Sequence, residues 1–265
     1  MKAISIAYHD IVERLEQCKS SVRRAPSYYT LERKTFQKHL EEIQGRSPSP
    51  LVTTIAAKNK WSAQVPVFLT FDDGAECAYT CVAGELEARG WRGHFFVTSS
   101  WIGKTGFMNA SQIRELHGRG HVIGSHTHTH PERMSNLSLN DLVNEWTVSR
   151  GILEDILGEP VRTASVADGY YSRKVGESAA QAGLEVLFNS EPVKSTGEEH
   201  GCLILGRYAV KAVTSPKGAG DLAEGAILPC LGQMALWEAK KAAKAIGGQS
   251  YLSVRRVLLS ARARL

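Results

Sequence analysis

Short apolar runs alternate along the chain with longer stretches that have helical periodicity. Two of the apolar runs stop abruptly at polar side chains: residues 65–71 lead to Asp72 and Asp73, and Val122–Ile123 lead to a group of histidines. Short apolar runs of this kind predict buried strands, and their alternation with helices predicts a parallel sheet, open or closed into a barrel. The sequence therefore predicts an α/β fold that forms one domain over residues 1–265.

The same pattern predicts the order of the elements. Strands are expected at residues 4–8, 65–71, 93–98, 122–123, 162–166, 184–188 and 203–210. Helices are expected at residues 35–43, 75–89, 110–117, 139–157, 172–182, 233–246 and 250–263. Residues 19–29 are polar and basic and predict a loop, and the glycine-rich residues 214–225 predict a loop with room for a short helix.

The composition is that of an ordinary soluble protein, with 43% hydrophobic and 22% charged residues. No apolar stretch is long enough for a transmembrane segment, and the first ten residues predict a strand rather than a secretory signal. The five cysteines are odd in number and irregularly spaced, which favours a reducing, cytoplasmic location. The net charge of +5 is modest, predicts no nucleic-acid partner and gives no indication of the oligomeric state. Much of its excess lies on arginines that more often form a solvated helix face than a phosphate site: Arg255, Arg256, Arg262 and Arg264.

The polar residues that follow the two strands are of the types that bind metal ions. Asp72 and Asp73 follow one strand, and His126, His128 and His130 follow the other. Because ligands bind at the carboxyl ends of parallel strands, these side chains predict a carboxylate–histidine metal site. An Asp-Asp-Gly sequence alone is equally typical of a turn, and the histidines favour the metal site. On an extended chain the three histidines share one face, so each is a candidate ligand.

Three segments around these residues match a known pattern. Thr70–Gly74 is followed about fifty residues later by Gly124–Pro131, and Gly93–Thr98 lies between them. Together they resemble the polysaccharide deacetylase family, carbohydrate esterase family 4, over roughly residues 4–188. The resemblance implies a distorted (β/α) barrel of about seven parallel strands, here with extra C-terminal helices. It also implies one divalent metal, zinc first with cobalt or nickel as alternatives, and hydrolysis of the acetamide of N-acetylated sugars.

The resemblance implies a role for each of these residues. Asp73, His126 and His130 would bind the metal. Asp72 would be the general base, and His128, at a variable position of the motif, would be a bystander. The chemistry agrees, because one carboxylate and two imidazoles leave metal positions open for water and a substrate oxygen. The metal lowers the pKa of the water that acts as nucleophile, and the second carboxylate removes its proton.

The general acid is expected at the start of the chain. Ile6–Asp10 resembles the N-terminal strand of exopolysaccharide deacetylases whose barrel is circularly permuted, and residues 28–43 also resemble that subgroup. In that subgroup the histidine after the tyrosine is the acid, which implies His9 here. The alternative is a strand-end histidine that only makes local hydrogen bonds.

The third motif of the family is altered in this chain. It is normally Arg-Pro-Pro-Tyr-Gly or Tyr-Pro-Tyr-Gly, and the matching stretch is Ser165–Gly169. A backbone N–H near Asp168 remains a candidate to stabilise an oxyanion. We expect Asp168, Gly169 and Tyr170 to contact the substrate, with a groove that differs from that of the family.

The fourth motif, an Asp-Trp segment with an arginine, is not recognisable. Arg162 and Arg207 are candidates to keep Asp72 ionised, although a structural charge is the more common role of such residues. The resemblance therefore favours an enzyme that removes acetyl groups from an N-acetylhexosamine in a carbohydrate or glycoconjugate. The alternatives are a catalytically silent barrel that binds carbohydrate and a hydrolase of a cyclic, non-sugar amide. Retention of both a base and an acid favours the enzyme.

Overall fold

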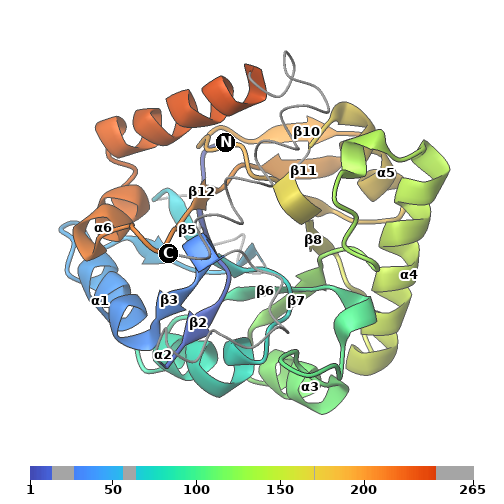
Figure 1. The fold of residues 1–265 in the computed structure, drawn as a ribbon, viewed down its shortest axis with the longest axis horizontal. Coiled ribbons are helices and arrows are strands. Elements are labelled where there is room, and N and C mark those ends of the chain that lie inside the picture. The colour runs from blue at the N-terminus through green and yellow to red at the C-terminus, as the bar shows by residue number, and fades with distance from the viewer. Residues whose placement is uncertain (14–26, 56–63, 170, 243–265) are drawn as a thin grey trace.

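A curled sheet forms the centre of the molecule, and helices cover its outer face (Figure 1). The computed structural model describes residues 1–13, 27–55, 64–169 and 171–242. The strands follow the order β10-β11-β9-β8-β7-β6-β5-β1-β12, with β4 paired to β5. All neighbours in this sheet are parallel except β10 and β11. The parallel, curled sheet agrees with the expected distorted barrel.

The strands of this sheet are short. Their bounds are β1 (Ile4–Tyr8), β4 (Leu51–Val52), β5 (Pro66–Phe71), β6 (His94–Val97), β7 (Val122–Ser125), β8 (Thr163–Ser165), β9 (Val186–Phe188), β10 (Gly197–Glu199), β11 (Cys202–Leu205) and β12 (Tyr208–Ala209). A separate pair is formed by β2 (Ile11–Val12) and β3 (Leu31–Glu32). Every residue of β1 and β5 is buried, as expected for parallel strands covered on both faces.

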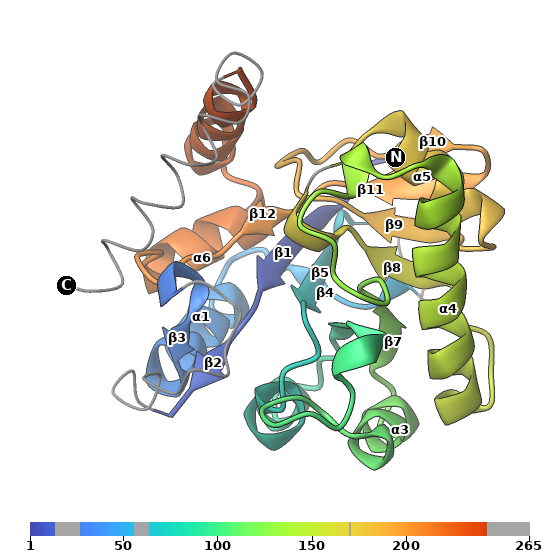
Figure 2. The ribbon, with the colours of Figure 1, turned by 45° about the vertical axis from the view of Figure 1, so that its right-hand side comes forward.

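Six helices with defined bounds surround the strands. They are α1 (Arg33–Gln44), α2 (Ala83–Glu87), α3 (Ala110–Gly118), α4 (Leu139–Leu157), α5 (Arg173–Gln181) and α6 (Pro216–Glu224). Residues 227–242 are also helical. Figure 2 shows α1 and α6 side by side on one flank of the sheet and α4 on the other. Among the helices that the structure describes, none combines the length and the apolar character needed to cross a membrane.

The local sequence explains where several helices begin and end. Helix α1 buries Phe36, Leu40 and Ile43, which recur at helical spacing on one face. Helix α4 begins after Ser138, whose side chain accepts a hydrogen bond from the backbone of Asp141. It ends at Gly158, which has φ 76° and adopts the left-handed conformation that glycine tolerates best.

Three expected elements differ from the structure. The helix expected at 75–89 begins with a π-helical turn, Ala78–Val82, before α2. The strand expected at 203–210 is interrupted between β11, which pairs with β9, and β12, which pairs with β1. At the interruption Gly206 passes so close to Glu191 that a Cβ atom would lie 2.2 Å from its carbonyl oxygen. Residues 214–225, expected to be a loop with room for a short helix, contain such a helix, the nine-residue α6, over most of their length.

The reason for helix α6 lies in its two ends. Ser215 accepts a hydrogen bond from the backbone of Gly218, Pro216 occupies the first helical position, and Gly225 closes the helix with φ 69°. These caps outweigh the low helix propensity of the internal glycines. The expected helix at 233–246 begins earlier, since residues 227–242 are helical, and the helix expected at 250–263 lies outside the described residues.

Candidate metal centre

Three predicted ligands converge at the carboxyl ends of β5 and β7. Asp73 follows β5, and His126 and His130 follow β7. The Nε2 atom of His126 lies 3.4 Å from Oδ1 of Asp73, and Nε2 of His130 lies 3.5 Å from the same oxygen. Their ligand atoms all lie within 4.8 Å of one another. The imidazole of His126 is almost completely buried, whereas Asp73 and His130 are partly open to solvent.

These separations fit a shared metal ion. Two ligand atoms that each lie about 2.0–2.1 Å from a tetrahedral zinc ion are about 3.4 Å apart. The Nδ1 atom of His126 lies 3.1 Å from the carbonyl oxygen of Ser165 and 2.6 Å from its hydroxyl. A carbonyl oxygen only accepts hydrogen bonds, so Nδ1 carries the proton and Nε2 is free to bind a metal. The donor set and the orientation of His126 therefore both suit a divalent ion.

The backbone is unusual at two of the three ligands. Asp73 has φ 74° and His130 has φ 57°, both in the left-handed region that non-glycine residues rarely adopt. Gly74 follows with φ 80°, and a Cβ atom there would lie 3.0 Å from the side chain of Val97. Non-glycine residues in this conformation cost free energy and cluster at functional sites. The chain therefore makes two strained turns to direct these side chains to one point.

His128 lies outside the cluster formed by Asp73, His126 and His130. Its Nδ1 atom is 2.9 Å from the hydroxyl of Ser99, and its backbone N–H donates to Glu145. The expectation that the three histidines share one face required an extended chain. Thr127 instead has φ 67°, which breaks the alternation directly before His128.

Asp72 is buried beside Asp73 and is bound by two donors. Arg207 Nη1 donates to Oδ1 of Asp72 over 2.7 Å, and the hydroxyl of Ser165 donates to the same oxygen over 3.0 Å. Burial opposes ionisation, but the positive charge of Arg207, with smaller contributions from the neighbouring rings of His126 and His9, outweighs it and holds the pKa of Asp72 well below its usual range.

The two candidate arginines separate clearly in the structure. Arg207 contacts Asp72, and its side chain is only 1% exposed. Arg162 pairs with Glu185, and both side chains of this pair are about half exposed. The structure therefore brings Arg207 and not Arg162 to the site.

His9 follows β1 and approaches Oδ2 of Asp72, whereas Arg207 contacts Oδ1. The Nε2 atom of His9 is 3.9 Å from Oδ2 of Asp72, and the side chain is 19% exposed. The imidazole stacks on Tyr29, with ring centroids 4.4 Å apart and an interplanar angle of 12°. Parallel pairing of β1 with β5 produces this proximity, because Tyr8 is in register with Phe71 and the residues that follow both strands lie together.

The altered third motif lies at the rim of the same site. Asp168 is exposed and has φ 52°. Burial is the main effect on the pKa of His130 and lowers it, and the nearby negative charge of Asp168 acts in the opposite direction. Gly169 has φ 67°, and a Cβ atom there would lie 2.6 Å from Ser190. Tyr170, the third expected substrate-binding residue, lies outside the described residues.

Two residues of the site had no expected role. Ser165 links His126 to Asp72 through its hydroxyl. Trp101 is buried and stacks on His130, with ring centroids 5.0 Å apart and an interplanar angle of 28°. Ser165 belongs to the altered third motif, and its position there was the available signal, whereas no sequence pattern marked Trp101.

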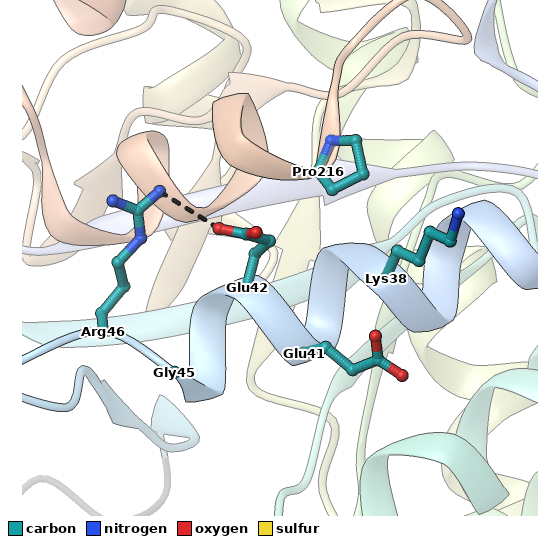
Figure 3. A pocket seen from close by; sticks show the side chains of 6 residues that line it. All are labelled: Lys38, Glu41, Glu42, Gly45, Arg46 and Pro216. Carbon is teal, nitrogen blue, oxygen red and sulfur yellow. Dashed lines mark ion pairs between the residues drawn. The ribbon is translucent and has the colours of Figure 1, made fainter.

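A separate hollow of about 600 Å³ lies between α1 and the start of α6 (Figure 3). Lys38, Glu41, Glu42, Arg46 and Pro216 line it together with one glycine. Figure 3 shows the guanidinium of Arg46 directed at the carboxylate of Glu42, at a distance of 3.7 Å. None of the predicted site residues lines this hollow.

Comparison with known proteins gives consistent matches. Residues 60–187 match the family model for polysaccharide deacetylase. A chitin deacetylase of Colletotrichum lindemuthianum is 32% identical over 80 residues, which are 30% of this chain and 32% of that protein.

Two solved structures are similar over most of the chain. The deacetylase PplD of Streptococcus pyogenes, in complex with acetate, superposes with a TM-score of 0.67 at 19% identity, covering 82% of this chain and 96% of that one. IcaB of Ammonifex degensii superposes with a TM-score of 0.65 at 20% identity, covering 84% of this chain and 97% of that one. These likenesses show the shared fold.

Proposed function

The chain belongs to the polysaccharide deacetylase family, whose members hydrolyse carbon–nitrogen bonds, and we propose that it removes acetyl groups from an N-acetylhexosamine unit of a carbohydrate or glycoconjugate in a metal-dependent reaction. The observation that carries this proposal is the convergence of Asp73, His126 and His130 directly beside Asp72 and His9. Ligands, a base and an acid are the groups that amide hydrolysis by a metal-dependent enzyme requires.

Asp73, His126 and His130 would hold the ion, with zinc as the first candidate and cobalt or nickel as alternatives. When bound, a divalent ion supplies a Lewis acid that polarises the acetamide carbonyl and lowers the pKa of water. Ser165 keeps the proton of His126 on Nδ1, which leaves Nε2, on the side of Asp73, unprotonated and able to bind a metal.

Asp72 would act as the general base. Its Oδ1 atom is engaged by Arg207 and Ser165, which leaves Oδ2 to accept a proton from the attacking water. The oxygen of that water forms a bond to the acetamide carbon. The low pKa of Asp72 keeps the carboxyl ionised and able to receive the proton.

His9 would act as the general acid. Its Nε2 atom lies 3.9 Å from Oδ2 of Asp72, so a substrate amide held beside the two side chains would be within hydrogen-bond reach of both. His9 delivers a proton to the amide nitrogen as the carbon–nitrogen bond breaks. The products are acetate and the free amine of the sugar.

The substrate class is supported by the family and by the names of similar proteins. A chitin deacetylase matches part of the chain, and a deacetylase of the same fold binds acetate. Asp168 and Gly169 lie at the rim of the site, with Tyr170 next in sequence, and we propose that this segment contacts the sugar. Its exposed carboxylate replaces an aromatic residue of the family motif, which favours polar over stacking contacts to the sugar.

An activity screen tests the proposal. The protein, reconstituted in turn with zinc, cobalt and nickel, is incubated with N-acetylated chito-oligosaccharides and with cyclic imides, and released acetate and amine are measured. We expect metal-dependent release of acetate from the oligosaccharides and none from an Asp72→Asn variant. Binding of the oligosaccharides by metal-loaded protein without release of acetate would instead identify a silent carbohydrate-binding barrel.

A further inference from the structure

The helix of residues 227–242 has an apolar side that faces solvent. This helix follows α6 and stands apart from the sheet in Figure 2. Four of the seven exposed large hydrophobic side chains of the described residues belong to it: Ile227, Leu228, Leu231 and Leu236. Leu228 is 83% exposed and Leu231 is 53% exposed. A helix of a soluble protein normally directs such residues to the core, so the apolar side is a candidate contact surface.

The opposite side of the helix contacts the rest of the protein. Cys230 is buried, and the side chain of Gln233 exchanges hydrogen bonds with the backbone N–H and carbonyl oxygen of Ala209 in the edge strand β12. Trp237 and Lys241 continue this side, with Lys241 Nζ 4.6 Å from the centroid of the indole ring. These residues recur at intervals of three and four and so lie on one side of the helix. The contacts on this side fix which residues face outward.

A stripe of apolar residues runs along the outward side. Its members are all exposed and also recur at intervals of three and four residues: Leu228, Leu231, Ala235, Ala239 and Ala242. Glu238 lies at one edge of this stripe. The helix therefore presents apolar residues to solvent on one side and makes its protein contacts on the other.

The charge of the chain changes directly after Glu238, which is the last acidic residue of the sequence. Seven of the 32 lysines and arginines follow it, and two of these, Lys240 and Lys241, are exposed on the helix itself. The rest of the chain has 25 basic and 27 acidic residues, so the positive excess comes from residues 239–265. The arginines of this stretch are interleaved with large apolar residues: Tyr251, Leu252, Val254, Val257, Leu258, Leu259 and Leu265. Basic residues interleaved with apolar ones are typical of segments that bind membrane surfaces.

We propose that residues 227–265 are a docking surface for an anionic lipid bilayer. The apolar stripe enters the bilayer at the level of the headgroups, and the lysines and arginines lie against the lipid phosphates. A nucleic acid would use the same charges but would leave the apolar stripe in water. A second copy of the chain would use the stripe but would bring like charges together. Of these three partners, only the bilayer matches both the apolar stripe and the positive charge.

Flotation of the full chain with lipid vesicles tests the proposal. The vesicles consist of phosphatidylcholine alone or of phosphatidylcholine mixed with phosphatidylglycerol, each at low and at high salt. We expect binding to the mixed vesicles only, and weaker binding at high salt because counterions screen the lipid charge. Asp72→Asn should bind as the original protein does, so a failure of the proposed function would leave this result unchanged.

Single substitutions separate the apolar from the charged contribution. Leu228→Ser should lower the partition coefficient about 10-fold, because it removes an inserted apolar side chain. Arg255→Gln should lower it about 5-fold, the effect of one basic residue at an anionic surface. The matched controls are Val213→Ser, which removes an 89% exposed apolar side chain ahead of α6, and Arg162→Gln, which removes an exposed arginine paired with Glu185. Both controls should bind as the original protein does.

A fluorescent probe attached to Leu228→Cys shows what covers the stripe. It should be open to an aqueous quencher without vesicles and shielded when mixed vesicles are added. Shielding without vesicles would assign the stripe to the end of the chain itself or to a second copy, and would overturn the proposal. No binding to mixed vesicles, equal binding by Leu228→Ser and the original protein, or tighter binding to single-stranded RNA than to mixed vesicles would also overturn it.

Discussion

Strand β7 has a histidine at each end, and the two imidazoles have opposite surroundings. At the amino end, Nδ1 of His121 accepts a hydrogen bond from the backbone of Gly93, and Nε2 lies 2.8 Å from Glu87. At the carboxyl end, Nε2 of His126 faces Asp73 at 3.4 Å, a separation suited to a shared ion rather than to a strong hydrogen bond.

The comparison shows what separates a structural histidine from a candidate ligand on the same strand. The amino-end ring has a protein partner at each nitrogen, so it has no atom left for a metal. The carboxyl-end ring has one nitrogen bound by the protein and the other directed at a second candidate ligand. The number of ring nitrogens that the protein itself satisfies is therefore more informative than burial, which is nearly complete at both ends.

The largest expected effect is loss of the metal at the carboxyl end. Asp73→Ala should abolish stoichiometric zinc, because it removes the oxygen that both imidazoles face. His121→Gln, at the amino end, should keep it. Elemental analysis of metal-reconstituted protein decides the matter, and full zinc occupancy in Asp73→Ala would contradict the assignment.

The next largest effect concerns His9, the proposed general acid. His9→Ala should lower kcat by about 10²–10⁴, the usual contribution of general acid–base catalysis, while zinc stoichiometry stays the same. Steady-state kinetics with matched metal analysis measure both. His117→Ala, which removes a histidine paired with Glu159 outside the site, should leave kcat unchanged. Equal kcat values for the two variants would leave His9 without a catalytic role.

His94, at the amino end of β6, should make the free energy of unfolding sensitive to acid. His94 starts β6, accepts a hydrogen bond from Ile55, and has a pKa that burial lowers from 6.5 to about 3. Because this folded-state pKa is below that of the unfolded chain, its contribution is complete above about pH 6.5 and is lost as the pH falls toward 3. We expect a loss of about 2 kcal/mol between pH 7 and pH 5.

Urea unfolding of metal-free protein at the two pH values tests this expectation. His94→Gln should be less stable at pH 7 but should lose about 2 kcal/mol less than the original protein on going to pH 5. Both proteins contain the other histidines, so the difference between their pH dependences reports the titration of His94 alone. Identical pH dependence in the two proteins would refute the assignment to His94.

The smallest effect is expected at His128. Its hydrogen bond to Ser99 is local, so His128→Ala should cost about 1 kcal/mol of stability and leave the zinc in place. His126→Ala, two residues earlier, should lose the zinc. Similar metal loss in both variants would show that the strained turn at Thr127 does not exclude His128 from the site.

The sequence alone predicted those parts of the fold that depend on local pattern. Apolar runs marked β1, β5 and β7, and helical spacing marked α1 and α4, because burial on a fixed face leaves a periodic signal. A short helix was left open at residues 214–225, but the extent of α6 was obscured by its glycines, since capping at Ser215 and Gly225 was a weaker signal than composition. The break at Gly206 separates two strands that pair with different neighbours, β9 and β1, and such long-range pairing leaves no local pattern.

The residues of the site also fall into those that a local motif predicts and those that depend on long-range contacts. Asp72, Asp73, His126 and His130 were predicted because they lie in short motifs at strand ends. The pairing of Arg207 with Asp72 joins residues 135 positions apart, and the choice between Arg207 and Arg162 required the strand order. Trp101 stacks on His130 through a loop contact that has no sequence signal.

The position of β1 in the sheet has a consequence for synthesis of the chain. Ile6 pairs on one side with Leu69 and on the other with Tyr208, so the strand that carries His9 lies between two neighbours that follow it in sequence. The second neighbour is made about 200 residues later, which at roughly 5–20 residues per second corresponds to about 10–40 s. Until then one edge of an apolar strand is unpaired, and such late, non-local pairing slows folding and exposes the chain to aggregation. His9, the proposed acid, is therefore synthesised long before its strand is enclosed on both sides in the sheet.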